Sequence, residues 1–497
     1  MISTLIRLLV TVATAFAQCP LRPAPVPFAT LPSSILAAAE LWGASLCAAS
    51  RSFSPLTSVQ FHARYFGETL ISGACGQSSS SLNATSSTLY RIASVSKIFP
   101  SLLLAQLAAQ QKVHQDATIS QTVPDFIVHD PWENSNGSSI TWRHLASHMA
   151  GLGRTTPAWL NNTEQALAAL AGPSGALSQP AGLTPQYSNI GFSLLGHLLA
   201  ERVLQQPYAQ VAFQRIFSPL NVTAGTGLDY TSAVLQRLAT GFQGGLLPLP
   251  FQPPGFMEPE GGVYSTASNL TFILDQLAAA TLGDRAATFA IGLQSAAQAR
   301  DFVKPLFVSA DGSFQQGTPW EMYQLPSSAF SYTVRGKDGG LPGFTSYAGF
   351  VPDLRLSVAM LWNTDNVGDI PVSPAFEILI PPLVEELSKV QPAPYPGPSA
   401  DHFVGTYVST SNPVEHSGTV TFANETLRFV SLGLAVTFAA VPTLPDSFYA
   451  NSAGTPPCQI LFEGATNAVF TFFRNTSTGL VGGFTANFTY GDLWVKV

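Results

Sequence analysis

Charged residues are scarce in this sequence, and the basic ones form no cluster. Only 10% of the 497 residues are Asp, Glu, Lys or Arg, and the formal net charge is −7. Proteins bind nucleic acids and anionic membrane surfaces through dense positive charge, so we expect neither as a partner. The hydrophobic content of 46% is ample for a large core, and the length predicts two domains rather than one.

The chain also lacks any apolar run of roughly 18 residues, the length that a membrane-spanning helix requires. Residues 1–17 combine a basic Arg7, an apolar stretch over 8–15 and a small-x-small sequence at 15–17. This pattern is typical of a secretory signal peptide. We therefore expect a soluble mature chain that is secreted or held in the lumen of the secretory pathway, without membrane contact after signal cleavage.

Glycosylation sequons and cysteines fit the same compartment. Four cysteines permit two disulfides in three connectivities, and the absence of a Cys-x-x-Cys motif disfavours a zinc or thioredoxin-like site. We expect the pairs Cys47–Cys75, within the main domain, and Cys19–Cys458, which would tie the N-terminal arm to the C-terminal module. Eight Asn-x-Ser/Thr sequons predict N-glycans, and they begin at Asn83, Asn136, Asn161, Asn221, Asn269, Asn424, Asn475 and Asn487.

A Pro-rich segment divides the mature chain. Proline occupies positions 392, 394, 396 and 398, which predicts a linker over 391–399. The main domain is then 18–390. Beyond the linker, apolar residues alternate with polar ones and turn residues separate the segments, so 400–497 is predicted to be an all-β module, a small barrel or a meander.

Helical and strand patterns mix within the main domain. The segment 241–262 shows neither period and is predicted to be a long loop rich in Pro and Gly. Two prolines at 381–382 should kink or divide the last helix. Helices are predicted over 34–47, 141–148, 192–203, 268–282 and 374–387, and strands over 57–66, 68–74, 332–340, 344–351 and 354–362.

A serine stands three residues before a lysine at Ser94-Val95-Ser96-Lys97, directly before an apolar run. If the run is helical, the two side chains share a face at its start. A desolvated lysine can take the proton of a serine hydroxyl and make it nucleophilic. The alternative is a polar helix cap with a solvated lysine, and this motif alone does not exclude it.

Two later motifs supply the other groups that acyl transfer needs. Tyr187 can pass a proton between Ser94 and a leaving group if nearby cations lower its pKa, and Asn189 can hold the Lys97 amine. Lys337, on a predicted strand, would keep the site positive and favour a phenolate on Tyr187.

His144 and His148 stand four residues apart and could face the same way on a helix. No acidic residue lies between them as in the usual zinc motif, and no third ligand is near in sequence. The preferred interpretation is two buried structural histidines, so no metal is expected.

These motifs resemble those of the serine β-lactamase and penicillin-binding-protein superfamily, especially its class C-like branch. They occur in the order Ser94/Lys97, Tyr187/Asn189 and Lys337-Asp338-Gly339-Gly340. Segments 90–97, 142–152, 186–196, 261–268 and 336–350 are similar to signature segments of that branch. The resemblance implies an α/β (α+β) fold of the β-lactamase/transpeptidase type. Such a fold has an antiparallel sheet flanked by helices, a helical subdomain and here a small C-terminal all-β, lipocalin-like domain.

The resemblance implies a serine hydrolase that works through an acyl-enzyme on an ester, amide or lactone of a small molecule, with no cofactor. Ser94, Lys97 and Tyr187 would be catalytic, while Asn189 and residues 337–340 would bind substrate. Backbone N–H groups of Ser94 and Gly340 would form the oxyanion hole. An acyltransferase or transesterase of natural-product biosynthesis is the close alternative, and a non-catalytic binding protein is the alternative of another class.

One position departs from the pattern of penicillin-recognising members. Asp338 stands where they have Thr, whose hydroxyl helps to hold the substrate carboxylate. An aspartate there would repel a carboxylate, so a neutral substrate fits better than a β-lactam. Alternatively, Asp338 only pairs with Lys337 and never meets the substrate.

The substitution Asp338→Thr should therefore improve acylation by a penicillin or cephalosporin relative to a neutral ester. Two charges about 4 Å apart at a partly exposed site interact by a few kcal/mol before screening, so a shift of about tenfold is expected. The ratio of kcat/KM for the two substrate types, in wild type and variant, measures it. An unchanged ratio would show that Asp338 does not face the substrate carboxylate.

Overall fold

The computed structural model describes residues 23 and 25–497 with internal gaps, and the chain divides into two compact units. One is Pro27–Leu383, and the other combines Met1–Val26 with Val384–Val497. The predicted signal peptide, the 391–399 linker, Cys19, Cys458 and three sequons (Asn136, Asn424 and Asn487) lie outside the described residues. The gaps are 133–138, 156–159, 173–174, 176, 328–329, 366–373, 391–399, 412–415, 424–425, 432–433, 441–446, 453–468, 476–477, 479 and 487–492.

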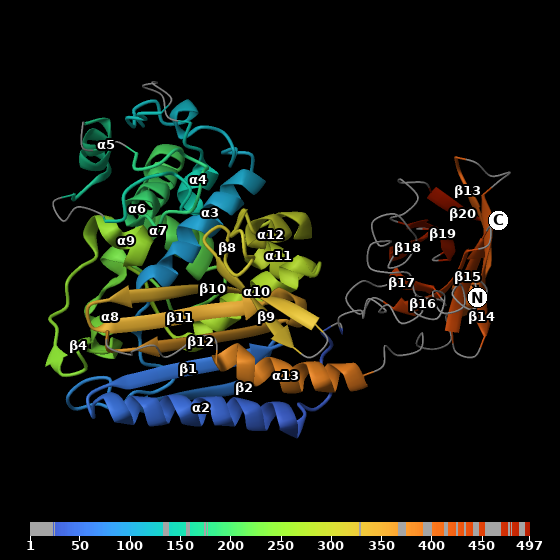
Figure 1. Ribbon diagram of the computed structural model, residues 1–497, viewed down its shortest axis with the longest axis horizontal. Helices are drawn as coiled ribbons and strands as arrows, with labels where there is room; N and C mark the ends of the chain where they lie inside the picture. Colours follow the sequence, from blue (N-terminus) through green and yellow to red (C-terminus); the bar gives the residue numbers. More distant parts are fainter. Residues whose placement is uncertain are drawn as a thin grey trace, which may run out of the picture. The chain divides into compact units, whose positions relative to one another are not determined.

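An antiparallel sheet of eight strands, in the order β2-β1-β12-β11-β10-β9-β8-β7, forms the centre of the larger unit (Figure 1). Because β1 pairs with β12, the first and last strands of this unit lie side by side. The strands are β1 (Ser58–Tyr65), β2 (Glu68–Gly76), β7 (Phe307–Val308), β8 (Gln315–Gln316), β9 (Glu321–Ser327), β10 (Phe330–Leu341), β11 (Phe344–Val351) and β12 (Leu356–Trp362).

Helices cover both faces of the sheet, as the amphipathic patterns predict. Helix α2 packs on β1 and β2, and α10 packs on β1, β11 and β12. The helices of this unit are α2 (Ser33–Phe53), α3 (Ile98–Ala109), α4 (Trp142–Ala146), α5 (Thr163–Ala171), α6 (Asn189–His197), α7 (Tyr208–Ala212), α8 (Ser232–Arg237), α9 (Glu258–Gly261), α10 (Ala267–Thr281), α11 (Arg285–Ala290) and α12 (Ala296–Val303). Helix α13 (Pro374–Lys389) follows and runs through both of its prolines without division.

The contact between α2 and the sheet depends on a close approach at Gly43. A Cβ at this position would lie 2.6 Å from the Ile71 side chain and 2.7 Å from the ring of Phe61. On the same face of the helix, Trp42 packs edge-on against Phe61. A glycine in mid-helix costs about 1 kcal/mol of helix propensity, and the buried aromatic contact that it permits offsets this cost.

Helix α3 lies at the centre of the helical region and is buried on all sides. Eleven of its twelve residues are buried, so it shows no polar face. It is continuous with a 3-10 turn over Ala93–Lys97, which carries the predicted nucleophile. Pro100 stands in the first turn of α3, where a missing N–H costs nothing because the N–H groups of a first turn have no partner within the helix.

The segment predicted to be a long loop contains short regular elements, so that prediction is wrong in part. It holds the paired strands β4 (Phe242–Gln243) and β5 (Leu247–Pro248) and the one-turn helix α9. Elements this short leave no visible period, which is why the sequence pattern did not reveal them. A second short pair, β3 (Tyr90–Arg91) with β6 (Tyr264–Ser265), joins the segment that follows α9 to the segment that precedes the 93–97 turn.

The C-terminal unit contains a closed antiparallel barrel, which confirms the predicted all-β module. Alternate residues, such as Leu427 and Phe429 or Phe470 and Phe472, face its interior and are buried there. The elements are α14 (Ala400–Phe403), β13 (Gly405–Ser409), β14 (Ser417–Ala423), β15 (Thr426–Ser431), β16 (Leu434–Ala440), β17 (Ser447–Ser452), β18 (Val469–Arg474), β19 (Val481–Ala486) and β20 (Leu493–Lys496).

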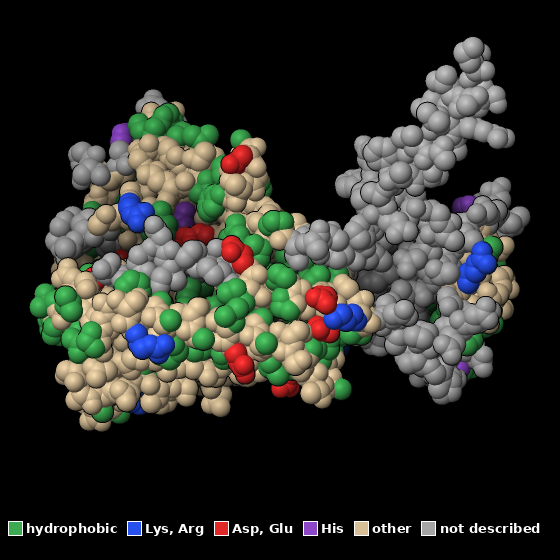
Figure 2. Space-filling view, turned by 60° about the horizontal axis from the view of Figure 1, so that its bottom comes forward, with side chains coloured by type: hydrophobic (Ala, Val, Ile, Leu, Met, Phe, Trp, Pro, Cys, Tyr) green, Lys and Arg blue, Asp and Glu red, His purple; other side chains and the backbone are tan. Residues whose placement is uncertain are grey.

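The low charge content is visible on the surface. Figure 2 shows acidic and basic side chains scattered singly or in small groups over one face, with no continuous basic patch in the described part. Among the described helices, none is both long and apolar enough to cross a bilayer.

A disulfide joins Cys47 of α2 to Cys75 of β2, as expected. It closes a loop with a sequence separation of 28 residues, so loop-closure entropy predicts that Cys47→Ser with Cys75→Ser lowers the free energy of unfolding by about 3 to 4 kcal/mol. Denaturant titration under oxidising conditions measures this loss. The exposed Ser45→Ala on the same helix is the control, with a change within about 0.5 kcal/mol. Equal stability of the double variant and the wild type would contradict the prediction.

Candidate active site

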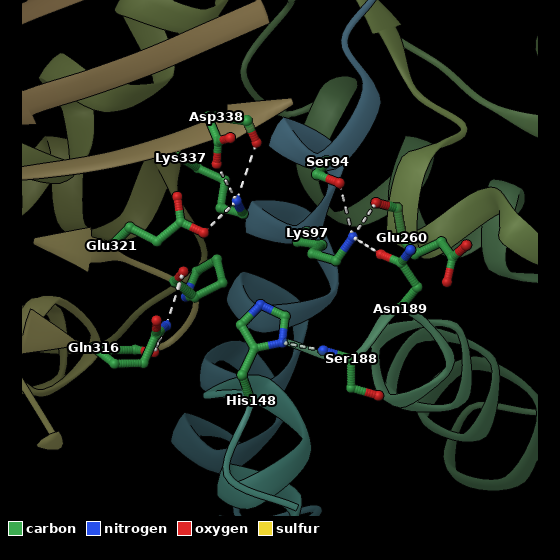
Figure 3. Close-up of polar contacts among 12 residues, drawn as sticks. Ser94, Lys97, His148, Ser188, Asn189, Glu260, Gln316, Glu321, Lys337 and Asp338 are labelled. Carbon is green, nitrogen blue, oxygen red and sulfur yellow. Dashed lines mark hydrogen bonds and ion pairs between the residues drawn. The ribbon is translucent and has the colours of Figure 1, made fainter. Parts of the chain in front are cut away.

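Ser94 and Lys97 lie together on the 3-10 turn before α3 (Figure 3). The Lys97 amine donates to the Ser94 hydroxyl at 3.0 Å. Ala93, the residue before the serine, has a left-handed backbone with φ +46°, which is strained for a residue with a side chain. The backbone oxygen of Ile92 accepts from the Ser346 hydroxyl at 2.6 Å and so fixes the turn to β11.

Lys97 is fully buried, and three groups from three segments surround its amine. Besides Ser94, it donates to the side-chain oxygen of Asn189 at 2.8 Å and to the backbone oxygen of Glu260 at 2.9 Å. Burial lowers the pKa of Lys97 to about 7, with Lys337 acting in the same direction and the charge of Glu260 opposing it. A lysine in this state is neutral in a large fraction of molecules at neutral pH, as a general base must be.

The spacing of the Tyr187-Ser188-Asn189 motif follows from its position at the start of α6. Ser188 is the N-cap, and its hydroxyl accepts from the backbone N–H of Gly191 at 3.0 Å. Asn189 is therefore the first residue of the helix and reaches Lys97, while Tyr187 precedes the cap. A side-chain hydrogen bond joins Tyr187 to Ser94.

Tyr187 differs from the expectation that it would be a phenolate. Its pKa is raised, because burial of the hydroxyl outweighs the opposing effects of Lys337 and of the hydrogen bond with Ser94. Its ring is nonetheless surrounded by cations, with the amines of Lys97 and Lys337 each 5.1 Å and the guanidinium carbon of Arg154 4.8 Å from the ring centroid. Tyr187 is thus a phenol, suited to giving a proton rather than taking one.

His148, which lies just after α4, packs against Tyr187. Its ring stacks on Tyr187 with the centroids 4.3 Å apart, and its Nδ1 atom accepts from the Ser188 backbone N–H at 3.0 Å. Burial lowers its pKa well below the usual value, so the ring is neutral. His144 instead accepts from the backbone N–H of Thr141 within the capping box of α4. Both predicted histidines thus have structural partners, and no metal-binding group of side chains is found among the described residues.

Strand β10 brings Lys337 and the glycines after it close to Ser94. A Cβ on Gly339 would lie 2.6 Å from the Ile92 oxygen and 2.9 Å from the Ser94 backbone nitrogen, so only glycine fits there. Gly340 has open space where its side chain would be. Close approach of this strand to the Ser94 N–H places its backbone beside the position where an oxyanion would form.

Lys337 is also fully buried, but its surroundings are the opposite of those of Lys97. Its amine donates to Glu321 Oε1 at 2.6 Å, to Asp338 Oδ1 at 2.8 Å and to the Asp338 backbone oxygen at 3.0 Å. Burial alone would lower its pKa, but Glu321, Tyr187 and Asp338 together raise it. The pairing of Asp338 with Lys337 is therefore present, and the lysine does not supply the uncompensated positive charge that was expected.

The structure places every predicted site residue in one region. It adds three residues that the sequence reasoning missed and a fourth, His148, that it treated only as a structural histidine. The predicted set is Ser94, Lys97, Tyr187, Asn189, Lys337, Asp338, Gly339 and Gly340. The additional residues are His148, Arg154, Glu260 and Glu321. Of these, Glu321 had a weak signal in the sequence, because it is a lone acid between the apolar residues Trp320 and Met322. Glu260 contributes through its backbone, which no side-chain pattern reveals.

A family model described as beta-lactamase matches residues 58–376, well over half of the chain. The chain belongs to the beta-lactamase family. Putative beta-lactamase-like 1 of Homo sapiens is 33% identical over 358 residues, which cover 70% of this chain and 66% of that protein. Beta-lactamase-like protein 4 of Dictyostelium discoideum is 30% identical over 320 residues, which cover 60% of this chain and 54% of that protein. The chain thus spans less than two thirds of the length of these curated relatives.

Solved structures show the same fold at low sequence identity. A class C beta lactamase from Rhodobacter sphaeroides aligns with a TM-score of 0.56 and 22% identity, covering 70% of this chain and 99% of that one. A structure titled SurE aligns with a TM-score of 0.56 and 18% identity, covering 93% of this chain and 100% of that one. The second alignment extends into the C-terminal unit. The family model confirms the predicted superfamily, and these structures confirm the predicted fold class.

The pKa of Lys97 predicts the pH dependence of acylation. Its folded-state pKa is lowered to about 7, so the neutral base forms as the pH rises through 7 and kcat/KM should fall about tenfold per pH unit below it. Because the Glu260 carboxylate raises this pKa, Glu260→Gln should move this rising limb of the pH profile of kcat/KM to lower pH. Rates of ester hydrolysis between pH 5 and 9 measure both.

Glu321 requires a control, because burial raises its pKa to about 7 as well. In Glu321→Gln the limb should persist, since Lys97 still titrates. A limb that disappears in this variant would assign the profile to Glu321 and contradict the prediction.

Proposed function

We propose that this chain is a serine hydrolase that forms an acyl-enzyme at Ser94 with an ester, amide or lactone of a small molecule. The observation that carries the proposal is the 3.0 Å contact between the Ser94 hydroxyl and a buried lysine whose pKa is lowered to about 7. The Asn189 and Glu260 oxygens fix that amine beside the serine. A non-catalytic binding protein would not need this arrangement.

In the proposed reaction, neutral Lys97 takes the proton of the Ser94 hydroxyl as its oxygen attacks the carbonyl carbon. The resulting oxyanion accepts hydrogen bonds from the backbone N–H groups of Ser94 and Gly340. The Tyr187 phenol gives its proton to the leaving group as the bond to it breaks, and the Lys97 ammonium then gives its proton to the resulting phenolate, so that both groups return to their starting states. Water then attacks the acyl-enzyme with the same groups acting in reverse.

The same acyl-enzyme could be released by an alcohol or an amine instead of water. Both routes use Ser94, Lys97 and Tyr187, and they differ only in the acceptor. Product analysis with and without added alcohols or amines separates the two routes. We propose hydrolysis as the primary activity, because water needs no binding site of its own.

We also propose that the protein is secreted or lumenal. The Cys47–Cys75 disulfide fits an oxidising compartment. The signal pattern over 1–17 and the sequons support the same location. Four sequon asparagines are exposed, namely Asn83, Asn161, Asn221 and Asn475, whereas the Asn269 side chain donates to the backbone oxygen of Thr223 from within α10.

The substitution Ser94→Ala should abolish turnover while leaving the fold intact. Removing one member of a catalytic group of this kind costs about a thousandfold or more in kcat. Intact mass after exposure to a fluorophosphonate probe and a panel of activated esters should show one adduct in the wild type and none in the variant. Ser101→Ala is the control, since its hydroxyl has no hydrogen-bond partner in the described part of the chain. Retention of more than about a tenth of wild-type activity would exclude Ser94 as the nucleophile.

A further inference from the structure

The hydrogen bonds of Lys337 are all made within the protein. A lysine ammonium has three N–H donors. In this structure the donors go to Glu321 Oε1, Asp338 Oδ1 and the Asp338 backbone oxygen, at 2.6, 2.8 and 3.0 Å. The Lys337 side chain is fully buried, so it has no N–H left to offer a substrate.

Glu321 reaches this position from the neighbouring strand. It begins β9, where it pairs with Gly336 of β10, the residue before the lysine. Its neighbours Trp320 and Met322 are buried on the other side of the strand, which directs Glu321 away from them. The Glu321 side chain retains 28% exposure and that of Asp338 66%, so the two carboxyl groups, and not the lysine, are what solvent and ligands can reach.

This cluster lies on the leaving-group side of the proposed reaction. The Lys337 amine is 5.1 Å from the ring centroid of Tyr187, the group that gives its proton to the leaving group. A carboxylate on the leaving group would therefore approach Glu321 and Asp338. It would have to break a charge-assisted hydrogen bond of Lys337 before it could form one.

We propose that Glu321 is a specificity-determining residue that, together with Asp338, withholds Lys337 from substrates whose leaving group carries a carboxylate. The inference rests on the proposed hydrolase function and narrows its substrates to esters and amides with neutral or cationic leaving groups. Lys337 then acts on Tyr187 rather than on the substrate. Asp338 alone would leave one N–H of the lysine available, so Glu321 completes the exclusion.

Two matched esters test this proposal, 4-acetoxybenzoate and 4-acetoxybenzamide, which share the acyl group and differ in the charge of the leaving group. The measurement is the ratio of their kcat/KM values at pH 8, where Glu321, with a pKa of about 7, is ionised. Glu321→Ala frees one N–H of Lys337 and should raise the carboxylate-to-neutral ratio about tenfold, as expected for a new charge-assisted hydrogen bond. Glu321→Ala with Asp338→Asn should raise it further.

Two controls separate specificity from a purely structural ion pair. Adding Lys337→Met to Glu321→Ala should abolish the gain, because the freed donor is then absent. Glu68→Ala, an exposed acid on β2, removes the same charge without contacting Lys337 and should leave the ratio unchanged. Arg154 is present in every variant, so any carboxylate binding by its guanidinium cancels in the comparison.

An equal ratio in Glu321→Ala and wild type, or a gain that persists without Lys337, would overturn the proposal. A structural role alone would lower both rates together. Should Glu321→Ala not fold, Glu321→Gln carries the test, with a smaller gain expected because the charge is lost but the hydrogen bond stays. If neither ester is turned over in a Ser94-dependent way, the hydrolase function itself fails, which is distinct from turnover with an unchanged ratio.

Discussion

The site depends on the buried Lys97 amine, whose N–H groups must find hydrogen-bond acceptors within the protein. Moving the Lys97 side chain out of water is costly unless its N–H groups find acceptors, and neutralising the amine reduces that cost. The acceptors are a hydroxyl, a side-chain amide and a backbone carbonyl, none of which carries a full charge. Burial therefore prevails, the pKa falls, and the lysine becomes a base. The strained Ala93 and the N-cap of α6 hold two of these acceptors in place.

Lys337 shows that the partners of a buried lysine decide the direction of its pKa shift. Both amines are fully buried and lie at equal distances from the Tyr187 ring, yet their pKa values shift in opposite directions. Lys337 has two carboxyl groups in contact and remains an ammonium, whereas Lys97 has none. One lysine type thus supplies a base and a fixed cation within one site, and both would lose their function if their partners were exchanged.

The sequence predicts the strands β1, β2, β10, β11 and β12, the helices α2, α4, α6, α10 and α13, the barrel and the residues of the catalytic motifs, because each leaves a period or a spacing. It does not indicate β7–β9 or the helices α5, α7, α8, α11 and α12. It does not predict α9 or the β4–β5 pair, which are too short to show a period. Nor does it predict the phenol state of Tyr187, because burial cannot be weighed against Lys337 without distances. Glu260 belongs to the site through its backbone carbonyl, and Glu321 belongs to it because it pairs across the strands with Gly336, next to Lys337. Both relations exist only in the folded chain, so motif spacing cannot reveal them.

The three groups around Lys97 also link activity to the completeness of folding. Its hydrogen bonds to Asn189 and Glu260 close chain segments of 92 and 163 residues, while the serine is only three residues away. Contacts over such separations carry a large entropic cost and form only as the whole unit assembles. In a partly folded chain the lysine stays solvated and protonated, and the serine remains an ordinary alcohol. The proposed nucleophile is thus activated only once the whole unit has folded, so a partly folded chain does not become acylated.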